Sequence, residues 1–197
     1  MAFLLLMAGI ASAANTPEEC LAEISEAMEA GDSARFEELI DLNPILESSL
    51  DTFLREAAKP ENASSLPPML AMLFTQNAGQ AGQAVKGMLI AAARAFVLGG
   101  VSSGAFAGRQ LDQSQSQNLL TPLFAQASVG RKEIRNIGQA VPDNGDWLLP
   151  FTVHDYGNDQ DYPVIGRFRQ SGDNIRLAAI ENLDQIFSQI QKEAALQ

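Results

Sequence analysis

The spacing of the hydrophobic positions changes about two thirds of the way along the chain. Before Gly130 the apolar residues recur every three or four positions, and after it they mainly alternate with polar ones. A spacing near 3.6 predicts amphipathic helices, and a spacing of two predicts strands with one buried face. The pattern therefore predicts helices first and strands later, which is the order of an α+β domain.

Three short helices are predicted in the first third of the chain. Thr16 and Glu19 have the spacing of a capping box, and Pro17 between them suits the first helical turn. Gly31 is expected to end this helix, and Asn43 begins the third one. The positions that share the inward faces are Leu21, Ile24, Met28, Phe36, Leu39, Ile40, Leu46, Leu50, Phe53 and Leu54.

The middle of the chain is apolar and rich in small residues. After a loop from Lys59 to Pro68, it predicts one long helix or two helices broken near Gly79–Gly82. Residues 87–108 resemble a membrane span in composition, but Arg94 lies near their centre. A charge at that depth costs at least about 2.5–3.5 kcal/mol. We therefore expect a buried helix and no stable membrane span, followed by a weaker helix from Gln113 to Ala127.

Alternating residues and tight turns predict a four-stranded antiparallel meander over residues 131–181. Asp143-Asn144-Gly145-Asp146 has the composition of a hairpin turn, which would pair Lys132–Val141 with the strand that follows. On that strand Trp147, Leu149, Phe151 and Val153 alternate with Leu148, Pro150, Thr152 and His154. Two further turns lead to strands at Tyr162–Arg169 and Ile175–Ile180.

The predicted elements form a single α+β domain over residues 16–197. Residues 16–128 are mainly helical and pack on the sheet of residues 131–181. Asn182 is then expected to cap a C-terminal amphipathic helix over residues 182–195. After removal of a leader about 184 residues remain, enough for one domain that buries roughly 70% of its unfolded surface.

Residues 1–13 have the form of a signal peptide. The apolar core from Phe3 to Ile10 is shorter than the roughly 20 residues that cross a bilayer. Ala11-Ser12-Ala13 supplies the small residues that signal peptidase accepts, so cleavage is expected before Ala14. A retained buried helix is the alternative, because no basic residue precedes the core. Acidic residues directly before Cys20 disfavour a lipid anchor. We therefore predict a periplasmic or secreted protein.

The net charge of −11 is unevenly distributed along the chain. Residues 15–64 carry −10, residues 65–130 carry +2, and residues 131–197 carry −3. An acidic first third repels nucleic-acid phosphates and anionic lipid headgroups. No basic stripe with interleaved aromatic residues is present, so nucleic-acid binding is excluded. The single cysteine excludes an internal disulfide.

Few residues are available for catalysis or for metal binding. His154 is the one histidine. We expect it to be exposed at the end of its strand, on the sheet face opposite to Trp147. A nucleophile elbow is absent, and one histidine with one cysteine excludes the usual zinc and iron sites. Asp155, Asp159 and Asp161 surround a turn but lack the calcium-loop pattern with its final Glu, so they are at most a weak calcium site. We predict no metal and no cofactor.

Three arginines are the remaining candidates for ligand binding. Arg167 and Arg169 share a strand face, and Arg176 lies on the neighbouring predicted strand. Together with His154 they are the candidate ligand-binding residues, because such a cluster would bind an anion. The alternative is that they pair with acidic residues of the same chain.

The last third of the chain resembles a known superfold. A meander with short polar turns that ends in Asp173–Ile180 and then Glu181-Asn182-Leu183 is similar to the cone-shaped α+β families related to nuclear transport factor 2. The chain also resembles secreted bacterial families of unknown function, whose helical first half is similar to Ala27–Asp51 here. The resemblance implies a pocket between sheet and helices, in a superfold that includes isomerases and non-catalytic binding modules. The last strand has Ile175 or Leu177 where such families often have Trp.

Three functions fit these features. The first is a non-enzymatic accessory protein that binds a protein partner or a small ligand in a pocket between sheet and helices. The second is a pocket enzyme with His154 or a buried Asp as general base, which requires an ionisable group in an apolar cavity. The third is an interaction module that forms a homodimer through its sheet face or its Met-rich helices.

Overall fold

The computed structural model describes residues 16–57, 59, 80–109 and 130–194. Strands follow most of the helices along the chain, and a helix ends it, which confirms the α+β class. The predicted signal peptide, the loop after Lys59 and the predicted helix over 113–127 lie outside the described residues. The element bounds are α1 (Pro17–Ala30), α2 (Ser33–Leu39), α3 (Leu42–Ala57), α5 (Gln80–Ser102), β1 (Lys132–Arg135), β2 (Val141–Asp143), β3 (Asp146–Asp155), β4 (Gln160–Ser171), β5 (Asn174–Ile180) and α7 (Leu183–Ala194).

The local signals at the two ends of α1 act as the sequence predicts, whereas α3 begins at Leu42, one residue before the predicted Asn43, and the predicted cap of α7 does not form. The Thr16 side chain accepts a hydrogen bond from the Glu19 N–H, and the Thr16 N–H donates to the Glu19 carboxylate in return, so the capping box forms. Gly31 ends α1 in the left-handed region with φ 77°. The side-chain oxygen of Asn182 instead accepts from the Ile165 N–H, and its amide donates to the Pro163 carbonyl. It thus joins β4 to the start of α7.

The strands form one antiparallel sheet in the order β1-β3-β4-β5, with β2 also paired to β3. The meander is confirmed, but the single strand expected over 132–141 is divided into β1 and β2. The cause is Asn136, whose φ of 52° turns the chain out of the extended conformation. The Gly138 N–H then donates to the Pro150 carbonyl over 2.8 Å and holds the intervening loop against β3.

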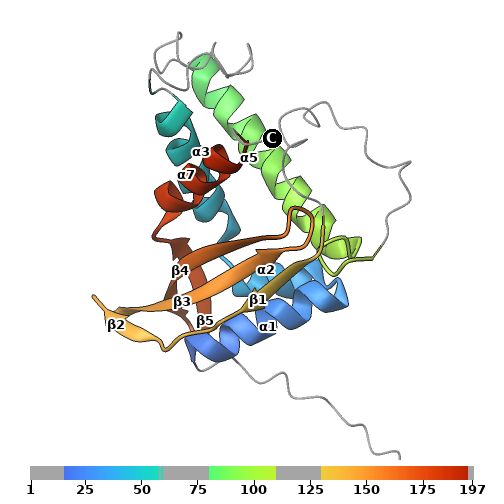
Figure 1. Cartoon of the computed structure of the whole chain (residues 1–197). Helices are drawn as coiled ribbons and strands as arrows, with labels where there is room; N and C mark the ends of the chain where they lie inside the picture. Colours follow the sequence, from blue (N-terminus) through green and yellow to red (C-terminus); the bar gives the residue numbers. More distant parts are fainter. Residues whose placement is uncertain (1–15, 58, 60–79, 110–129, 195–197) are drawn as a thin grey trace, which may run out of the picture.

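One face of the sheet packs on the helices. Leu149 and Phe151 of β3 and Val164 and Phe168 of β4 are buried in a core that α1, α2 and the end of α5 complete. In Figure 1, α1 and α2 cross the lower part of the molecule, and α3, α5 and α7 rise above the sheet. The side chains of β3 and β4 with the opposite parity are half-buried or exposed, except for His154.

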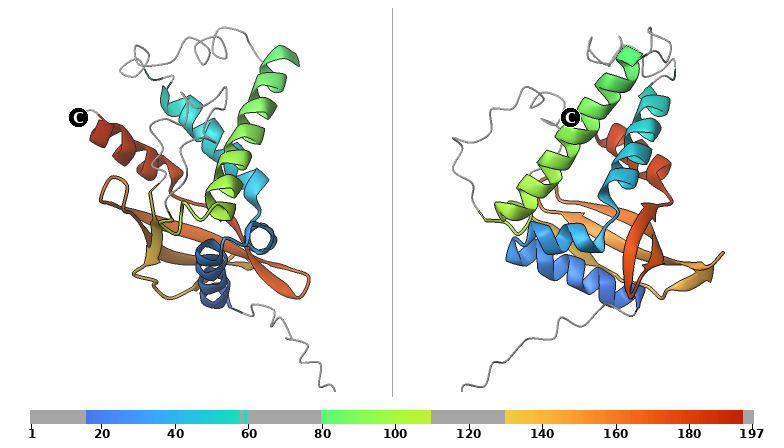
Figure 2. Two further views of the ribbon diagram at one scale, coloured as in Figure 1. Left: turned by 90° about the vertical axis from the view of Figure 1, so that its right-hand side faces the viewer. Right: turned by 180° about the vertical axis from the view of Figure 1, so that it is seen from behind.

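The helix α5 is much more exposed than its sequence predicts. Only Leu89 and Val101 are buried between residues 83 and 102, within the part of the chain that the structure describes. This stretch is long and apolar enough to cross a membrane by length and composition alone, with a mean hydropathy of 1.6. Arg94 instead forms an ion pair with Glu37 of α2, and Lys86 forms one with Asp51 of α3 at 2.7 Å. Figure 2 shows α5 beside α3 in both views.

Candidate functional site

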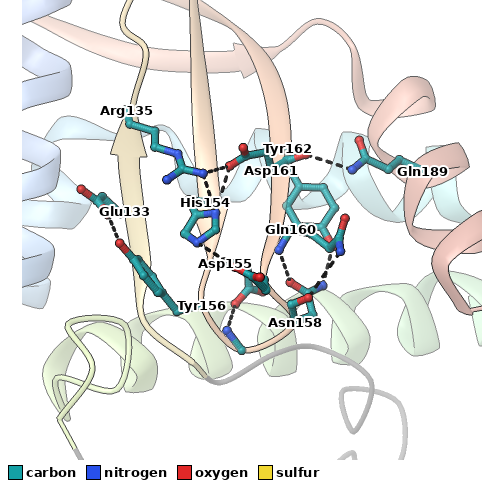
Figure 3. Close-up of polar contacts among 12 residues, drawn as sticks. Glu133, Arg135, His154, Asp155, Tyr156, Asn158, Gln160, Asp161, Tyr162 and Gln189 are labelled. Atoms are coloured by element: carbon teal, nitrogen blue, oxygen red, sulfur yellow. Dashed lines mark hydrogen bonds and ion pairs between the residues drawn. The ribbon is translucent and has the colours of Figure 1, made fainter. Parts of the chain in front are cut away.

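The polar residues around His154 form the main cluster of ionisable groups at the turn between β3 and β4 (Figure 3). His154 is at the end of β3, and its register partners are Glu133 on β1 and Asp161 on β4. All three lie on the sheet face opposite to the core. The histidine is 6% exposed, so the expectation of an exposed strand-end histidine is wrong.

His154 is enclosed because its neighbours on the adjacent strands reach across it. Its Nδ1 lies 2.8 Å from Nη2 of Arg135 and 2.9 Å from Oδ1 of Asp161. Arg135 also donates to the same Asp161 oxygen. The Tyr156 ring packs edge-on against the imidazole, with 4.3 Å between the centroids. A histidine that appears isolated in the sequence thus becomes part of a network from three strands.

The two close contacts at Nδ1 exclude one another in a neutral imidazole. If Nε2 carries the hydrogen, Nδ1 accepts from Arg135; if Nδ1 carries it, the ring donates to Asp161. Nε2 lies 3.6 Å from the Asp159 carboxylate, which is too long for a hydrogen bond. The tautomer of His154 therefore selects its partner. The hydrogen bond from Arg135, with a smaller one from His154, lowers the pKa of the Asp161 carboxyl below its ordinary 3.8.

A tyrosine–glutamate pair also flanks the histidine. The Tyr156 hydroxyl donates to the Glu133 carboxylate, which raises the pKa of the tyrosine and lowers that of the glutamate. The Arg131 guanidinium lies 5.0 Å from the centroid of the Tyr156 ring, on its face. Charges of both signs thus surround His154.

The network continues from the β3–β4 turn to the C-terminal helix. Gln189 of α7 donates to the Asp161 carbonyl over 2.9 Å. The Tyr162 hydroxyl donates to Glu193 of α7 over 2.8 Å. Burial, followed by this hydrogen bond, raises the pKa of Tyr162 to about 12. The turn is therefore fastened to α7 by two polar contacts.

The three aspartates around the turn do not converge on a calcium site. Asp155 points to the core face, where it pairs with Lys132 at 2.9 Å. Asp159 and Asp161 lie near His154 on the opposite face. Among the residues that the structure describes, no group of three or more possible metal ligands is found.

The three candidate arginines each contact carboxylates of this chain. Arg167 pairs with Asp143, Asp146 and Glu181. Arg169 donates to both carboxylate oxygens of Asp146, at 3.1 and 2.9 Å.

Arg176 pairs with Asp41 at 2.8 Å and donates to the carbonyls of Glu37 and Ile40. Arg169 and Arg176 are register partners, but their guanidinium groups contact different acids. His154 lies near the other end of β3 and β4 from Arg167 and Arg169, so the four candidate residues do not form one site.

Two surface hollows stand out on the described part of the chain, and neither contains the histidine. The first has a volume of about 550 Å³ and is open and shallow; it is lined by Ala34, Glu37, Glu38, Ser171, Asn174 and Arg176. The second, of about 410 Å³, lies along the exposed side of α7. Where the sheet meets α1 and α2, fully buried Leu21, Leu149 and Phe168 fill the interface.

The arrangement around His154 can hold and pass a proton between an imidazole and a carboxylate, and neither of the two hollows described above is lined by it. Sequence reasoning selected His154 and missed Arg135, Glu133 and Tyr156, which complete its surroundings. The predicted hairpin was the available signal, because its register, continued from the turn at Asp143–Asp146, places Arg135 opposite His154. The bend at Asn136 shifts β1 by two residues, so that Glu133 is the observed partner. The chain matches no protein-family model, no curated protein sequence and no solved structure.

Proposed function

We propose that the mature chain is a non-enzymatic protein of the periplasm or the extracellular space that binds a protein partner through α5. The observation that carries the proposal is the apolar side of α5 that the described residues leave exposed. We call this side the α5 outer face. Its exposed residues are Ala84, Gly87, Met88, Ala91, Ala95 and Gly99.

The composition of the α5 outer face favours a protein partner. Met88 is 50% exposed, and a contiguous apolar surface on a folded protein commonly marks an interaction site. The cations that flank the face, Lys86 and Arg94, are already paired with Asp51 and Glu37. A lipid surface is a poorer fit, because the acidic helices that hold α5 would be brought against anionic headgroups.

The geometry around His154 supports the non-enzymatic reading over a pocket enzyme. A general base needs a hydrogen-bonding position next to a bound substrate. The Nδ1 of His154 faces Arg135 and Asp161, and the ring is 6% exposed. The superfold resemblance is compatible with a binding module, and it does not by itself specify the partner.

The docking surface can be tested by placing a photo-crosslinking side chain at position 88 of the exported protein. We expect a discrete crosslinked product, and we expect Ala95→Glu to abolish it. The same crosslinker at Ala22, an exposed residue of α1, is the matched control. The partner is then identified and purified, and its affinity for wild type and for Ala95→Glu is measured by calorimetry. Equal yields from positions 88 and 22, or equal affinities, would contradict the proposal.

The compartment is tested on the same material. N-terminal sequencing of the exported protein should begin at Ala14. Protein recovered from the cell interior with Met1 intact would contradict the extracytoplasmic part of the proposal.

A further inference from the structure

We propose that the partner of the α5 outer face is a second copy of this chain, bound with the two α5 helices antiparallel about a twofold axis that passes between Ala91 and Ala95, at the level of Ala93. The inference rests on the proposed function and specifies the partner of the same surface. It is supported by three observations on α5: the symmetry of its exposed positions, the open space beside them and the absence of charge.

The exposed positions of α5 are symmetric about residue 93. In a twofold dimer the same patch of both copies meets, so the patch must be complementary to itself. In an antiparallel pair centred on Ala93, residues equally distant from that position face each other. Gly87 then faces Gly99, and Ala91 faces Ala95. The same order of side chains is thus met from either direction along the helix.

The larger apolar side chains follow the same symmetry. Met88, which is 50% exposed, faces Leu98, which is half-buried in the single copy. Each would cover the other in the dimer, on both sides of the axis. Burial of such side chains stabilises an association, because apolar area is removed from water.

Small side chains on the α5 outer face permit a close approach of the two helices. A Cβ atom built on Gly87 or on Gly99 meets nothing within 4 Å, so the space beside both glycines is open among the described residues. The antiparallel arrangement also places the positive end of each helix dipole beside the negative end of the other. The dipole alignment favours the antiparallel pair over a parallel one.

Charge distinguishes a second copy from a partner selected by electrostatics. Two chains with a net charge of −11 repel each other, and the repulsion is weakest where the facing surfaces carry no charge. The residues of the α5 outer face carry none. A basic or acidic partner would require ionised groups on the docking surface, and Lys86 and Arg94 are held at its edge by Asp51 and Glu37.

The register is tested by disulfide trapping in the otherwise native chain. Cys20 is 0% exposed and does not compete for oxidation. Ala91→Cys and Ala95→Cys variants, mixed and oxidised, should give a mixed-disulfide dimer in larger yield than either variant alone. A mixture of Ala91→Cys with Ala84→Cys is the control, because a disulfide forms only where the Cα atoms lie within about 7 Å.

Oligomeric state provides the second readout. Sedimentation of the wild-type mature chain should show a dimer. Ala91→Glu should weaken the association at least about 100-fold, because two unpaired carboxylates would be buried at the axis. Ala22→Glu on α1 should leave it unchanged, and circular dichroism verifies that both variants are folded.

The outcomes separate this inference from the proposed function. A chain that is monomeric at every concentration, while position 88 crosslinks a different protein, overturns the inference and leaves the proposed function intact. A dimer without preference for the Ala91→Cys and Ala95→Cys pair also overturns it, because the register is then wrong. If position 88 crosslinks only to residues within its own molecule, and to no second copy and no other protein, both proposals are overturned.

Discussion

The side chains around His154 show how a strand-end residue becomes buried mainly beneath polar groups. Arg135 and Asp161 reach over the imidazole from the two neighbouring strands, and Tyr156 closes one side. Because the histidine is buried largely by polar contacts, the stability of this part of the fold depends on the ionisation of the groups involved.

Asp161 should contribute to stability in a pH-dependent way. Its pKa is below the ordinary 3.8 in the folded state, mainly because Arg135 donates to it, so the native carboxyl binds a proton less readily than the unfolded one. The contribution is present above pH 3.8 and is lost as the pH falls through the lower folded value. In Asp161→Asn the melting temperature should fall less steeply between about pH 6 and about pH 2.5 than in wild type.

The matched control for this measurement is Asp173→Asn, in the exposed turn between β4 and β5. Its acid profile should follow that of wild type more closely than the profile of Asp161→Asn does. Equal acid profiles for wild type and Asp161→Asn would show that the Arg135 contact does not bias the folded state.

The two tyrosines of the chain should ionise late. The pKa of Tyr156 is raised above 10 by Glu133, and burial with the Glu193 contact raises the pKa of Tyr162 to about 12. A Tyr156→Phe variant leaves Tyr162 as the one phenol. Its ultraviolet titration should have a midpoint at about 12 while circular dichroism reports a folded chain. A midpoint near 10 in the folded protein would contradict the burial of Tyr162.

At the scale of elements, the end of α5 is fixed by one close contact. The Phe106 N–H donates to the Gly100 carbonyl over 3.1 Å, and the aromatic ring then lies directly against Gly100. A Cβ atom at this position would be 2.4 Å from the ring. Gly99, one residue earlier, faces open space. Of these two adjacent glycines, Gly100 has no room for a side chain, whereas Gly99 has.

Substitution of these glycines should therefore have opposite effects on stability. Gly100→Ala should lower the free energy of unfolding by about 1–3 kcal/mol, because Phe106 must move out of the core. Gly99→Ala should leave it unchanged or raise it by up to about 1 kcal/mol, because alanine has the higher helix propensity. Urea denaturation at a concentration that keeps the chain monomeric measures both. Similar losses in the two variants would argue against the Phe106 contact.

Local signals in the sequence were sufficient for most element ends. Thr16, Glu19 and Gly31 act within a few residues of themselves, and the structure confirms the helix they were predicted to bound. The burial of His154 and the exposure of α5 could not be predicted in the same way. Both depend on residues from other elements: Arg135 and Asp161 for the histidine, and the way α2 and α3 hold α5 through Arg94 and Lys86.

At the scale of the whole molecule, the core is assembled without covalent crosslinks. Cys20 is fully buried on α1, within hydrogen-bonding range of the Leu39 carbonyl, with 3.8 Å between sulfur and oxygen. Burial is the main cause that raises the pKa of its thiol to about 12. The cysteine packs as a small apolar residue between α1 and α2.

The folded chain should accordingly be indifferent to the redox conditions of its compartment. Its melting temperature should be the same with and without a thiol reductant, because a single buried cysteine closes no disulfide. A thiol-specific reagent should label Cys20 only after unfolding in urea. Labelling of the native protein at the rate of the unfolded chain, or a covalent dimer through Cys20, would contradict this expectation.

The division of the strand predicted over residues 132–141 into β1 and β2 also affects the edge of the sheet. β1 has four residues, and Lys132, Glu133 and Arg135 are charged. A border this short, with ionised side chains and a bend at Asn136 directly after it, offers a poor template for a foreign extended chain. The irregularity that interrupts the meander should therefore disfavour amyloid-like growth along β1.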